Sequence, residues 1–221
     1  MKVCTDACLF GAYIAANIQH LKFNIQHIQD IGTGTGLLSL MLAQQTNAII
    51  DAVEIDGSAS AQAKENFEAS PWKERLHIFN EDIKSFKADK KYDLIISNPP
   101  FYEDDLRSVD EQKNKAKHEG ALNLQELLKI ATASLNEEGC FAILLPFYRV
   151  ASCEAMAFED DLHLIKKVLV RQTTAHNHFR GILIFSKSKI EMRSTEMAIK
   201  NEDGKYTDEF TALLQNYYLH L

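Results

Sequence analysis

Residues 25–45, IQHIQDIGTGTGLLSLMLAQQ, contain the pattern that decides the fold. Apolar and polar residues alternate as far as Ile31, three glycines follow at alternate positions, and an apolar helical pattern runs from Leu37 to Gln45. Alternation is typical of a strand, and the later pattern is typical of a helix. Because glycine accepts backbone conformations that other residues avoid, the segment predicts a strand, a tight turn and a helix.

The same succession of strand and helix recurs along the chain. Further strands are predicted over residues 48–54, 76–79, 92–97 and 140–145, and further helices over residues 7–16, 58–70, 124–135 and 210–219. Thr5 and Asp6 precede the first helix and are predicted to cap it. Two β-rich stretches, residues 162–170 and 181–185, predict an antiparallel hairpin at the sheet edge.

Short apolar strands that alternate with helices form parallel sheets with helices on both faces. An antiparallel ending to such a sheet resembles the class I methyltransferase fold. The resemblance implies a Rossmann-like α/β fold with a seven-stranded, mostly parallel sheet and an antiparallel edge strand. Since no linker or internal repeat interrupts the chain, a single domain is expected over residues 1–221.

An acid precedes the glycine turn. Asp30 is followed by Gly32, Gly34 and Gly36, so the third glycine comes one residue earlier than in the dinucleotide-binding fingerprint. The D-x-G-x-G-x-G pattern resembles the S-adenosylmethionine motif. A carboxylate here repels a diphosphate but suits a ligand with a sulfonium and an amino group. Asp30 either orients backbone donors or attracts the cofactor's ammonium through water, and a tight turn without a ligand is the alternative.

Polar residues also follow the next three predicted strands. Glu54 ends the second strand, where a carboxylate can accept both ribose hydroxyls of a cofactor, and Asp56 either assists it or caps the next helix. Asp82 resembles the residue that accepts a hydrogen bond from the cofactor's adenine amino group. Asn98 follows the fourth strand. Acids at strand ends are also common as plain helix caps. The prediction of a cofactor site therefore rests on the placement of Asp30, Glu54, Asp82 and Asn98 at the carboxyl ends of four successive strands.

The segment Asn98-Pro99-Pro100-Phe101 is the candidate catalytic site. The lone pair of an adenine amino group is delocalised into the ring, which makes the nitrogen a poor nucleophile. The Asn98 side-chain oxygen and the Pro99 carbonyl can accept the two amino hydrogens and aim the lone pair at a methyl donor. Pro100 helps to hold that carbonyl in one direction, and Phe101 offers a ring on which a base stacks. A β-turn that merely ends a strand is the alternative.

These motifs, together with the opening Met1-Lys2-Val3-Cys4-Thr5-Asp6 and Lys117-His118-Glu119, resemble the bacterial tRNA1(Val) adenine-37 N6-methyltransferase family. The resemblance covers essentially the whole chain. It implies S-adenosylmethionine as cofactor, an unpaired adenine beside the anticodon as substrate, and Thr5 and Asp6 near the cofactor. Family members usually carry a short aromatic and basic segment before this opening, which this sequence lacks; if that segment has been removed, we expect part of the substrate surface to be missing.

The expected RNA contacts follow the catalytic segment and are Tyr102, Arg107, Lys113, Lys115 and Lys117. Acids in the same stretch make a solvated loop the alternative. The net charge of −7 argues against a protein that coats nucleic acid without specificity. Residues 163–190, however, contain no Asp or Glu and several Lys and Arg, which predicts one basic face.

Three other functions remain open. A glutamine methyltransferase of release factors also presents an amide to N-P-P, but it usually has Tyr at the position of Phe101 and an additional N-terminal helical domain. A DNA adenine methyltransferase usually has a target-recognition domain of its own. The third is a cofactor-binding protein without activity. We expect a cytoplasmic protein with no membrane segment, no evident protein partner and no metal, because no long apolar run and no zinc-type Cys/His spacing occur.

Overall fold

The computed structural model describes residues 4–18, 25–100 and 122–220, and the strands within them form one sheet. Its eight strands lie in the order β3-β2-β1-β4-β5-β7-β6-β8. The strands are β1 His27–Ile31, β2 Ile49–Val53, β3 Leu76–Phe79, β4 Tyr92–Ser97, β5 Leu135–Pro146, β6 His163–Thr173, β7 His178–Ser186 and β8 Arg193–Lys200. The helices are α1 Thr5–Asn17, α2 Leu37–Ala43, α3 Gly57–Ala69, α5 Leu124–Ser134, α6 Val150–Glu159 and α7 Asp208–Leu214, with short 3-10 turns η2 Lys73–Arg75 and η3 Phe147–Arg149.

The sheet is mostly parallel, as predicted, but its C-terminal half differs in detail from the prediction. β6 and β7 form the expected antiparallel hairpin, and β7 also pairs antiparallel with β5. The antiparallel strand therefore lies inside the sheet and not at its edge. Strand β8 pairs parallel with β6 and forms the actual edge. The prediction missed β8 because only Met197 and Ile199 of this strand are buried, which leaves little apolar alternation to detect.

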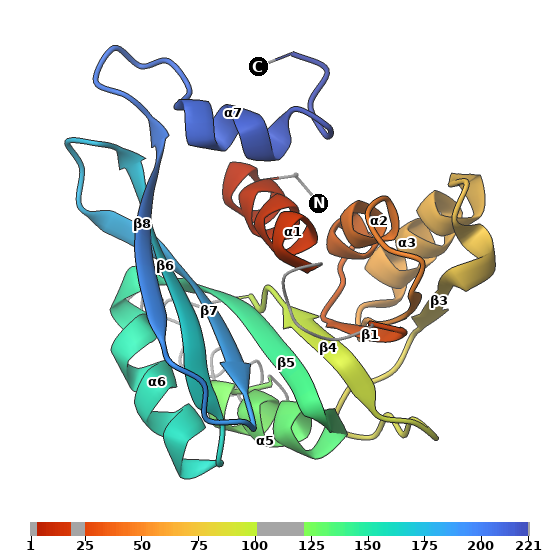
Figure 1. Cartoon of the computed structure of the whole chain (residues 1–221). Coiled ribbons are helices and arrows are strands. Elements are labelled where there is room, and N and C mark those ends of the chain that lie inside the picture. Colours follow the sequence, from red (N-terminus) through yellow and green to blue (C-terminus); the bar gives the residue numbers. More distant parts are fainter. Residues whose placement is uncertain (1–3, 19–24, 101–121, 221) are drawn as a thin grey trace, which may run out of the picture.

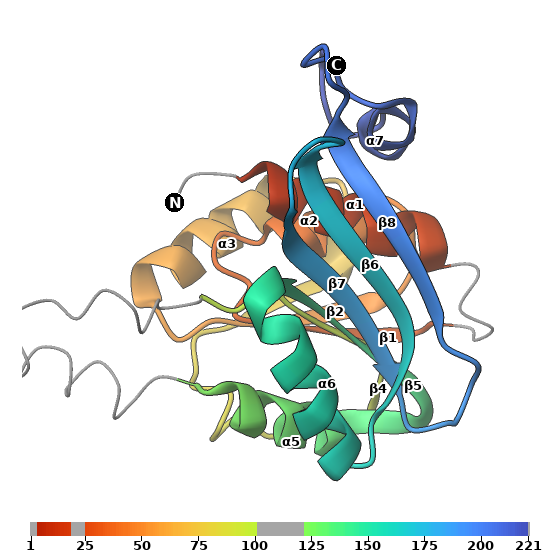
Figure 2. The same cartoon turned by 90° about the vertical axis from the view of Figure 1, so that its left-hand side faces the viewer.

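Helices cover both faces of the sheet (Figures 1 and 2). Helices α1, α2 and α7 enclose one apolar core with residues such as Phe10, Leu42 and Phe210, and α5 and α6 enclose the other with residues such as Leu128 and Phe185. Burial of this apolar surface is the main driving force for folding. Along β7, alternate residues serve the two cores, since Ile182 and Ile184 lie in the first and Leu183 and Phe185 in the second.

Two helices deviate from the predicted pattern. In α1, Cys4 occupies the N-cap position and makes no side-chain capping bond, whereas Thr5 and Asp6 already belong to the helix. The prediction that Thr5 and Asp6 cap this helix was therefore wrong. Helix α6 was not predicted, and its apolar face is short, with Val150, Cys153 and Ala157 buried. Helix α7 is the expected final helix but ends at Leu214.

Parallel pairing brings the carboxyl ends of β1, β2, β3 and β4 to one edge. Ile31 pairs with both Val53 and Ser97, and Val53 pairs with Phe79. The segments that follow these residues are therefore neighbours, although they lie far apart in the sequence. In the described part of the chain, no helix is long and apolar enough to cross a membrane.

Candidate functional site

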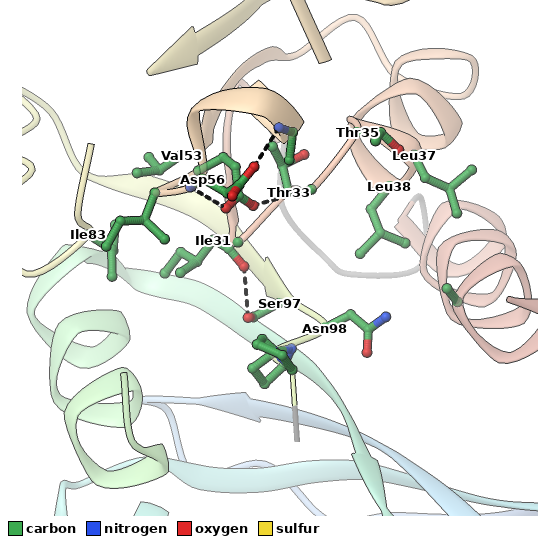
Figure 3. A pocket seen from close by; sticks show the side chains of 18 of the residues that line it. Ile31, Thr33, Thr35, Leu37, Leu38, Val53, Asp56, Ile83, Ser97 and Asn98 are labelled. Carbon is green, nitrogen blue, oxygen red and sulfur yellow. Dashed lines mark hydrogen bonds between the residues drawn. The ribbon is translucent and has the colours of Figure 1, made fainter. Parts of the chain in front are cut away.

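A cleft of about 1190 Å³ lies at this carboxyl edge. Its walls come from the glycine turn, the ends of β2 and β4, the segment after β3, and the start of α1. Figure 3 shows Thr33 and Asp56 on one side of the cleft, Ser97 and Asn98 on the opposite side, and Ile83 and Leu38 at its two flanks. A single small-molecule site typically has about 300–1,000 Å³, so the cleft has room for a cofactor and part of a substrate.

The three glycines of the turn have left-handed backbone conformations, with φ of 72° at Gly32, 59° at Gly34 and 86° at Gly36. A Cβ at Gly36 would lie 2.5 Å from the Phe67 ring of α3, so this glycine allows close packing and does not line the cleft. A Cβ at Gly32 would meet nothing within 4 Å. Gly32 and Gly34 line the cleft and leave its floor open to a ligand.

Asp30 lies beneath the turn and is fully buried. The hydroxyls of Thr33 and Ser39 donate to its Oδ2 at 2.6 and 2.8 Å. Burial raises the pKa of the Asp30 carboxyl to about 6, and the hydroxyl donors partly oppose this shift. Asp30 is not among the residues that line the cleft. In the structure it ties the turn to the first residues of α2 through these two hydroxyls.

Glu54 faces the cleft from the end of β2 and links the turn to the chain that follows β2. Its two carboxylate oxygens accept the backbone N–H of Gly34 at 2.8 Å and that of Asp56 at 2.9 Å. The Asn80 amide donates to the Glu54 carbonyl at 2.8 Å and holds this segment against the end of β3. A carboxylate has about four acceptor positions, so Glu54 retains capacity for ligand hydroxyls.

The two other acids line the cleft in different ways. Asp56 is the N-cap of α3 and accepts from the Ala59 N–H and the Ser58 hydroxyl, both at 2.8 Å. These hydrogen bonds lower the pKa of the Asp56 carboxyl. Its geometry is that of the predicted helix cap. Asp82 accepts the Lys84 N–H through Oδ1 at 2.9 Å, which leaves Oδ2 without a hydrogen bond to the described residues.

The N-P-P segment begins where β4 ends. The Ser97 hydroxyl donates to the Ile31 carbonyl at 2.8 Å and locks the end of β4 to the end of β1 (Figure 3). Asn98, Pro99 and Pro100 follow and line the cleft. Within the described residues, the Asn98 side chain makes no hydrogen bond, and Figure 3 shows its amide projecting away from Ser97. No described residue therefore occupies this amide oxygen, and the side chain lines the cleft with an acceptor.

Asp6 joins the cleft from the start of α1. Its Oδ2 accepts from Arg180 Nε of β7 at 2.7 Å, and both side chains line the cleft. Thr5 does not line the cleft and instead lies close to the Tyr218 side chain near the C-terminus. The structure thus brings Asp6, Gly32, Gly34, Glu54, Asp56, Asp82 and Asn98 together and leaves Thr5, Asp30 and Gly36 as supporting residues. The predicted Phe101, Tyr102, Arg107, Lys113, Lys115 and Lys117 lie outside the described residues.

Sequence reasoning missed Arg180 as a residue of the cleft. Its only signal was its position in the acid-free stretch 163–190. That stretch was predicted to make one face basic, and the structure shows that part of its positive charge is paired with acids. Acids from other segments pair with its cations, and these pairs are Lys167 with Glu154, Arg171 with Glu196, Arg180 with Asp6, and Lys187 with Glu137.

Known proteins resemble this chain in both fold and sequence. A predicted O-methyltransferase from Agrobacterium tumefaciens has a similar structure, with a TM-score of 0.71 at 13% identity over 94% of this chain and 95% of that one. A glycopeptide N-methyltransferase in complex with S-adenosylmethionine has a TM-score of 0.59 at 10% identity over 80% and 93%. At such low identity these likenesses establish the class I methyltransferase fold alone.

The sequence comparisons are more specific. Residues 13–147 match the methyltransferase small domain family. Relatives named tRNA1(Val) (adenine(37)-N6)-methyltransferase are 40% identical in Flavobacterium johnsoniae, 38% in Salmonella enteritidis and 35% in Parabacteroides distasonis, over all of this chain and 94%, 89% and 92% of theirs. The chain therefore belongs to the tRNA1(Val) (adenine(37)-N6)-methyltransferase family.

Proposed function

We propose that this chain transfers a methyl group from S-adenosylmethionine to the exocyclic N6 of an adenine in tRNA, with adenine 37 in the anticodon loop of tRNA1(Val) as its target. The observation that carries the proposal is the placement of Asn98-Pro99-Pro100 in the same cleft as the glycine turn and Glu54. The names of the relatives, which match over the whole chain, support the choice of substrate. We further propose that residues 1–221 act as one domain in the cytoplasm, where tRNA is present.

The residues of the cleft fit S-adenosylmethionine. The open floor at Gly32 admits a ligand close to the backbone. Glu54 retains acceptor positions for ribose hydroxyls, and Asp82, with Ile83 beside it, supplies an acceptor and an apolar contact for an adenine ring. When bound, the cofactor supplies a methyl group on a positively charged sulfur. The carboxylates of Asp6, Glu54, Asp56 and Asp82 around the cleft suit a ligand with this charge.

Asn98 and Pro99 perform the central step on the substrate. The Asn98 side-chain oxygen accepts one hydrogen of the adenine amino group, and the Pro99 carbonyl accepts the other. The two hydrogen bonds draw the nitrogen toward a tetrahedral geometry and hold its lone pair in one direction. After transfer the nitrogen carries a positive charge and releases one proton to water, so the step needs no dedicated base.

The prolines make this acceptor pair rigid. The proline ring fixes φ near −65° and removes the N–H that could otherwise compete for the amino group. The hydrogen bond from Ser97 to the Ile31 carbonyl anchors the segment on its other side. A preorganised acceptor needs no rearrangement during the reaction, which is the basis of its catalytic effect. We expect Phe101, the next residue in the sequence, to stack on the substrate base.

Release-factor glutamine methylation is the second candidate, because an amide nitrogen can also donate two hydrogens to Asn98 and Pro99. The Phe at position 101 and the full-length match to tRNA methyltransferases favour the adenine. DNA adenine methylation shares the same chemistry, and the names of the relatives favour tRNA over DNA.

The test is methyl transfer from labelled S-adenosylmethionine to tRNA from a strain that lacks this modification. We expect transfer by the wild-type protein, and we expect Asn98→Ala to lower kcat by about 10²–10³-fold, the effect of losing one preorganised hydrogen bond. The dissociation constant of S-adenosylmethionine should stay within about twofold, since Asp6, Glu54 and Asp82 remain. Mass spectrometry of digested tRNA identifies the methylated position.

Asn216→Ala is the matched control, because Asn216 is exposed and uses only its backbone carbonyl in a hydrogen bond with Gln44. It should leave kcat unchanged. Transfer to release factor but not to tRNA would show that the second candidate is correct. If Asn98→Ala keeps the kcat of the wild type, Asn98 does not take part in the methyl transfer.

A further inference from the structure

The 3-10 turn η3, Phe147–Arg149, exposes two aromatic side chains at the edge of the sheet that carries the cleft. Phe147 is 41% exposed and Tyr148 is 60% exposed. Large aromatic side chains usually bury most of their surface. Their exposure next to a substrate cleft is typical of a binding surface.

The position of η3 follows from the strand register. Ser97 of β4 pairs with Ile143 of β5, so the end of β5 lies beside the segment Asn98-Pro99-Pro100. Pro146, the last residue of β5, pairs with Arg180, which lines the cleft. Neighbouring strands lie about 5 Å apart, and η3 follows Pro146 directly. A nucleotide next to a base in the cleft can therefore reach η3.

The side chains of η3 are held in place by their neighbours. The Phe147 ring packs against the His178 ring, with centroids 5.2 Å apart. The Arg149 guanidinium lies over the Tyr148 ring, 5.6 Å from its centroid. A cation over one face of an aromatic ring stabilises its orientation, and the exposed surface of Tyr148 remains available for stacking.

We propose that Phe147, Tyr148 and Arg149 form a stacking platform for the unpaired RNA nucleotide next to the target adenine. The proposal rests on the proposed tRNA activity. It adds a contact through which the protein selects RNA whose nucleotide next to the target adenine is unpaired. An aromatic ring stacks on any base, and the Arg149 guanidinium over the Tyr148 ring supports the orientation of that ring. Because Arg171 and Arg180 of the neighbouring strands are already paired with Glu196 and Asp6, we expect stacking to contribute more than net charge at this surface.

The test compares the KM for an anticodon stem-loop RNA among variants at saturating S-adenosylmethionine. We expect Tyr148→Ala to raise this KM by about 5- to 150-fold, the range of one base–aromatic stacking contact. The kcat and the KM for S-adenosylmethionine should stay within about twofold, because Tyr148 does not line the cleft. Tyr148→Phe keeps the ring and should behave as the wild type.

Phe158→Ala is the matched control. Phe158 is 71% exposed but lies at the far end of α6, near His163 at the start of β6, which is the opposite edge of the sheet. We expect no change in the KM for RNA. Equal KM values for the Tyr148→Ala and Phe158→Ala variants, with an active wild-type protein, overturn the platform. A wild-type protein that methylates no RNA overturns the proposed function itself.

A second measurement identifies the stacked base. An abasic residue replaces each neighbour of the target adenine in turn, and its effect on KM is combined with Tyr148→Ala in a double-mutant cycle. At the neighbour that stacks on Tyr148, the abasic residue and Tyr148→Ala remove the same contact. Combining them should therefore raise KM no more than either change alone. If the increases in KM multiply at both neighbours, Tyr148 contacts neither base, and this result overturns the proposal.

Discussion

At the scale of single residues, Asp30 is a buried acid that organises the glycine turn without lining the cleft. Its carboxylate accepts the Thr33 and Ser39 hydroxyls and joins the glycine turn to α2. Burial favours the neutral form and raises the pKa to about 6. Asp56 is the exposed N-cap of α3, and the hydrogen bonds that it accepts lower the pKa of its carboxyl. Asp30 and Asp56 therefore make opposite contributions to the pH dependence of stability.

The first residue-scale prediction concerns Asp30→Asn. A folded pKa of about 6 lies above the ordinary aspartate value of 3.8, so the unfolded chain ionises first and stability falls as the pH rises from about 4 to 6. Asparagine lacks this penalty. The free energy of unfolding of Asp30→Asn relative to the wild type should therefore increase by about 2 kcal/mol between pH 4.5 and pH 7.5, measured by urea unfolding at each pH.

Asp56→Asn is the control with the opposite sign. The lowered pKa of Asp56 stabilises the folded protein above its unfolded pKa, and this stabilisation is lost as the pH falls. The wild type should thus gain stability relative to Asp56→Asn as the pH rises from 3 to 5. If the difference in free energy of unfolding between Asp30→Asn and the wild type does not change with pH, the pKa of Asp30 is not raised in the folded protein.

At the scale of elements, the glycine turn depends on α3 as much as on its own sequence. Gly36 is the residue before α2, and the space for a Cβ there is filled by the Phe67 ring. The backbone N–H groups of Gly32 and Thr33 also donate to the Val53 carbonyl at 2.9 and 3.2 Å. The turn therefore has its shape only when β2 and α3 are in place.

Gly36→Ala should cost more stability than Gly204→Ala. Both glycines have positive φ, 86° and 76°, but a Cβ at Gly204 meets nothing within 4 Å. Gly204→Ala should cost about 1–2 kcal/mol for the backbone alone, and Gly36→Ala about 1–3 kcal/mol more for the clash. Urea unfolding of both variants measures this difference.

A Phe67→Leu background separates the two causes. The smaller side chain relieves the contact with a Cβ at position 36, so Gly36→Ala in this background should cost about as much as Gly204→Ala. If Gly36→Ala and Gly204→Ala cost the same in the wild-type background, α3 does not restrict the turn.

At the scale of the whole molecule, the cleft joins segments from both ends of the chain. Asp6 and Arg180 meet across it although the chain between them forms most of the sheet. The Tyr217 hydroxyl donates to the Met41 carbonyl at 3.3 Å, so the C-terminal segment rests on α2 behind the glycine turn. Changes in the C-terminal part of the chain can therefore affect the glycine-turn side of the cleft.

Binding of tRNA should depend on salt through Lys113, Lys115 and Lys117, which the sequence places soon after the catalytic segment. If the three contact phosphates, replacing them with Gln should reduce the slope of log K against log salt by about 2. Fluorescence titration of tRNA at several salt concentrations measures this slope. The control variant replaces Lys64, Lys129 and Lys189, which are exposed and do not line the cleft. An unchanged slope in the first variant rules out phosphate contacts by these lysines.

The sequence by itself determined the order of strands and helices from residue 25 to residue 100 and from residue 124 to residue 145, because each strand has a strong apolar pattern and each turn has its own residue signals. It also placed Glu54, Asp82 and Asn98 at strand ends, and parallel strands bring their ends to one edge. Only the tertiary structure decided that Asp30 and Gly36 support the cleft from behind and that Arg180 joins it. Strand β8 and the pairing of the basic stretch with distant acids also came from the tertiary structure. The physical reason is the same in each case, since burial and ion pairing depend on contacts between segments that no local pattern records.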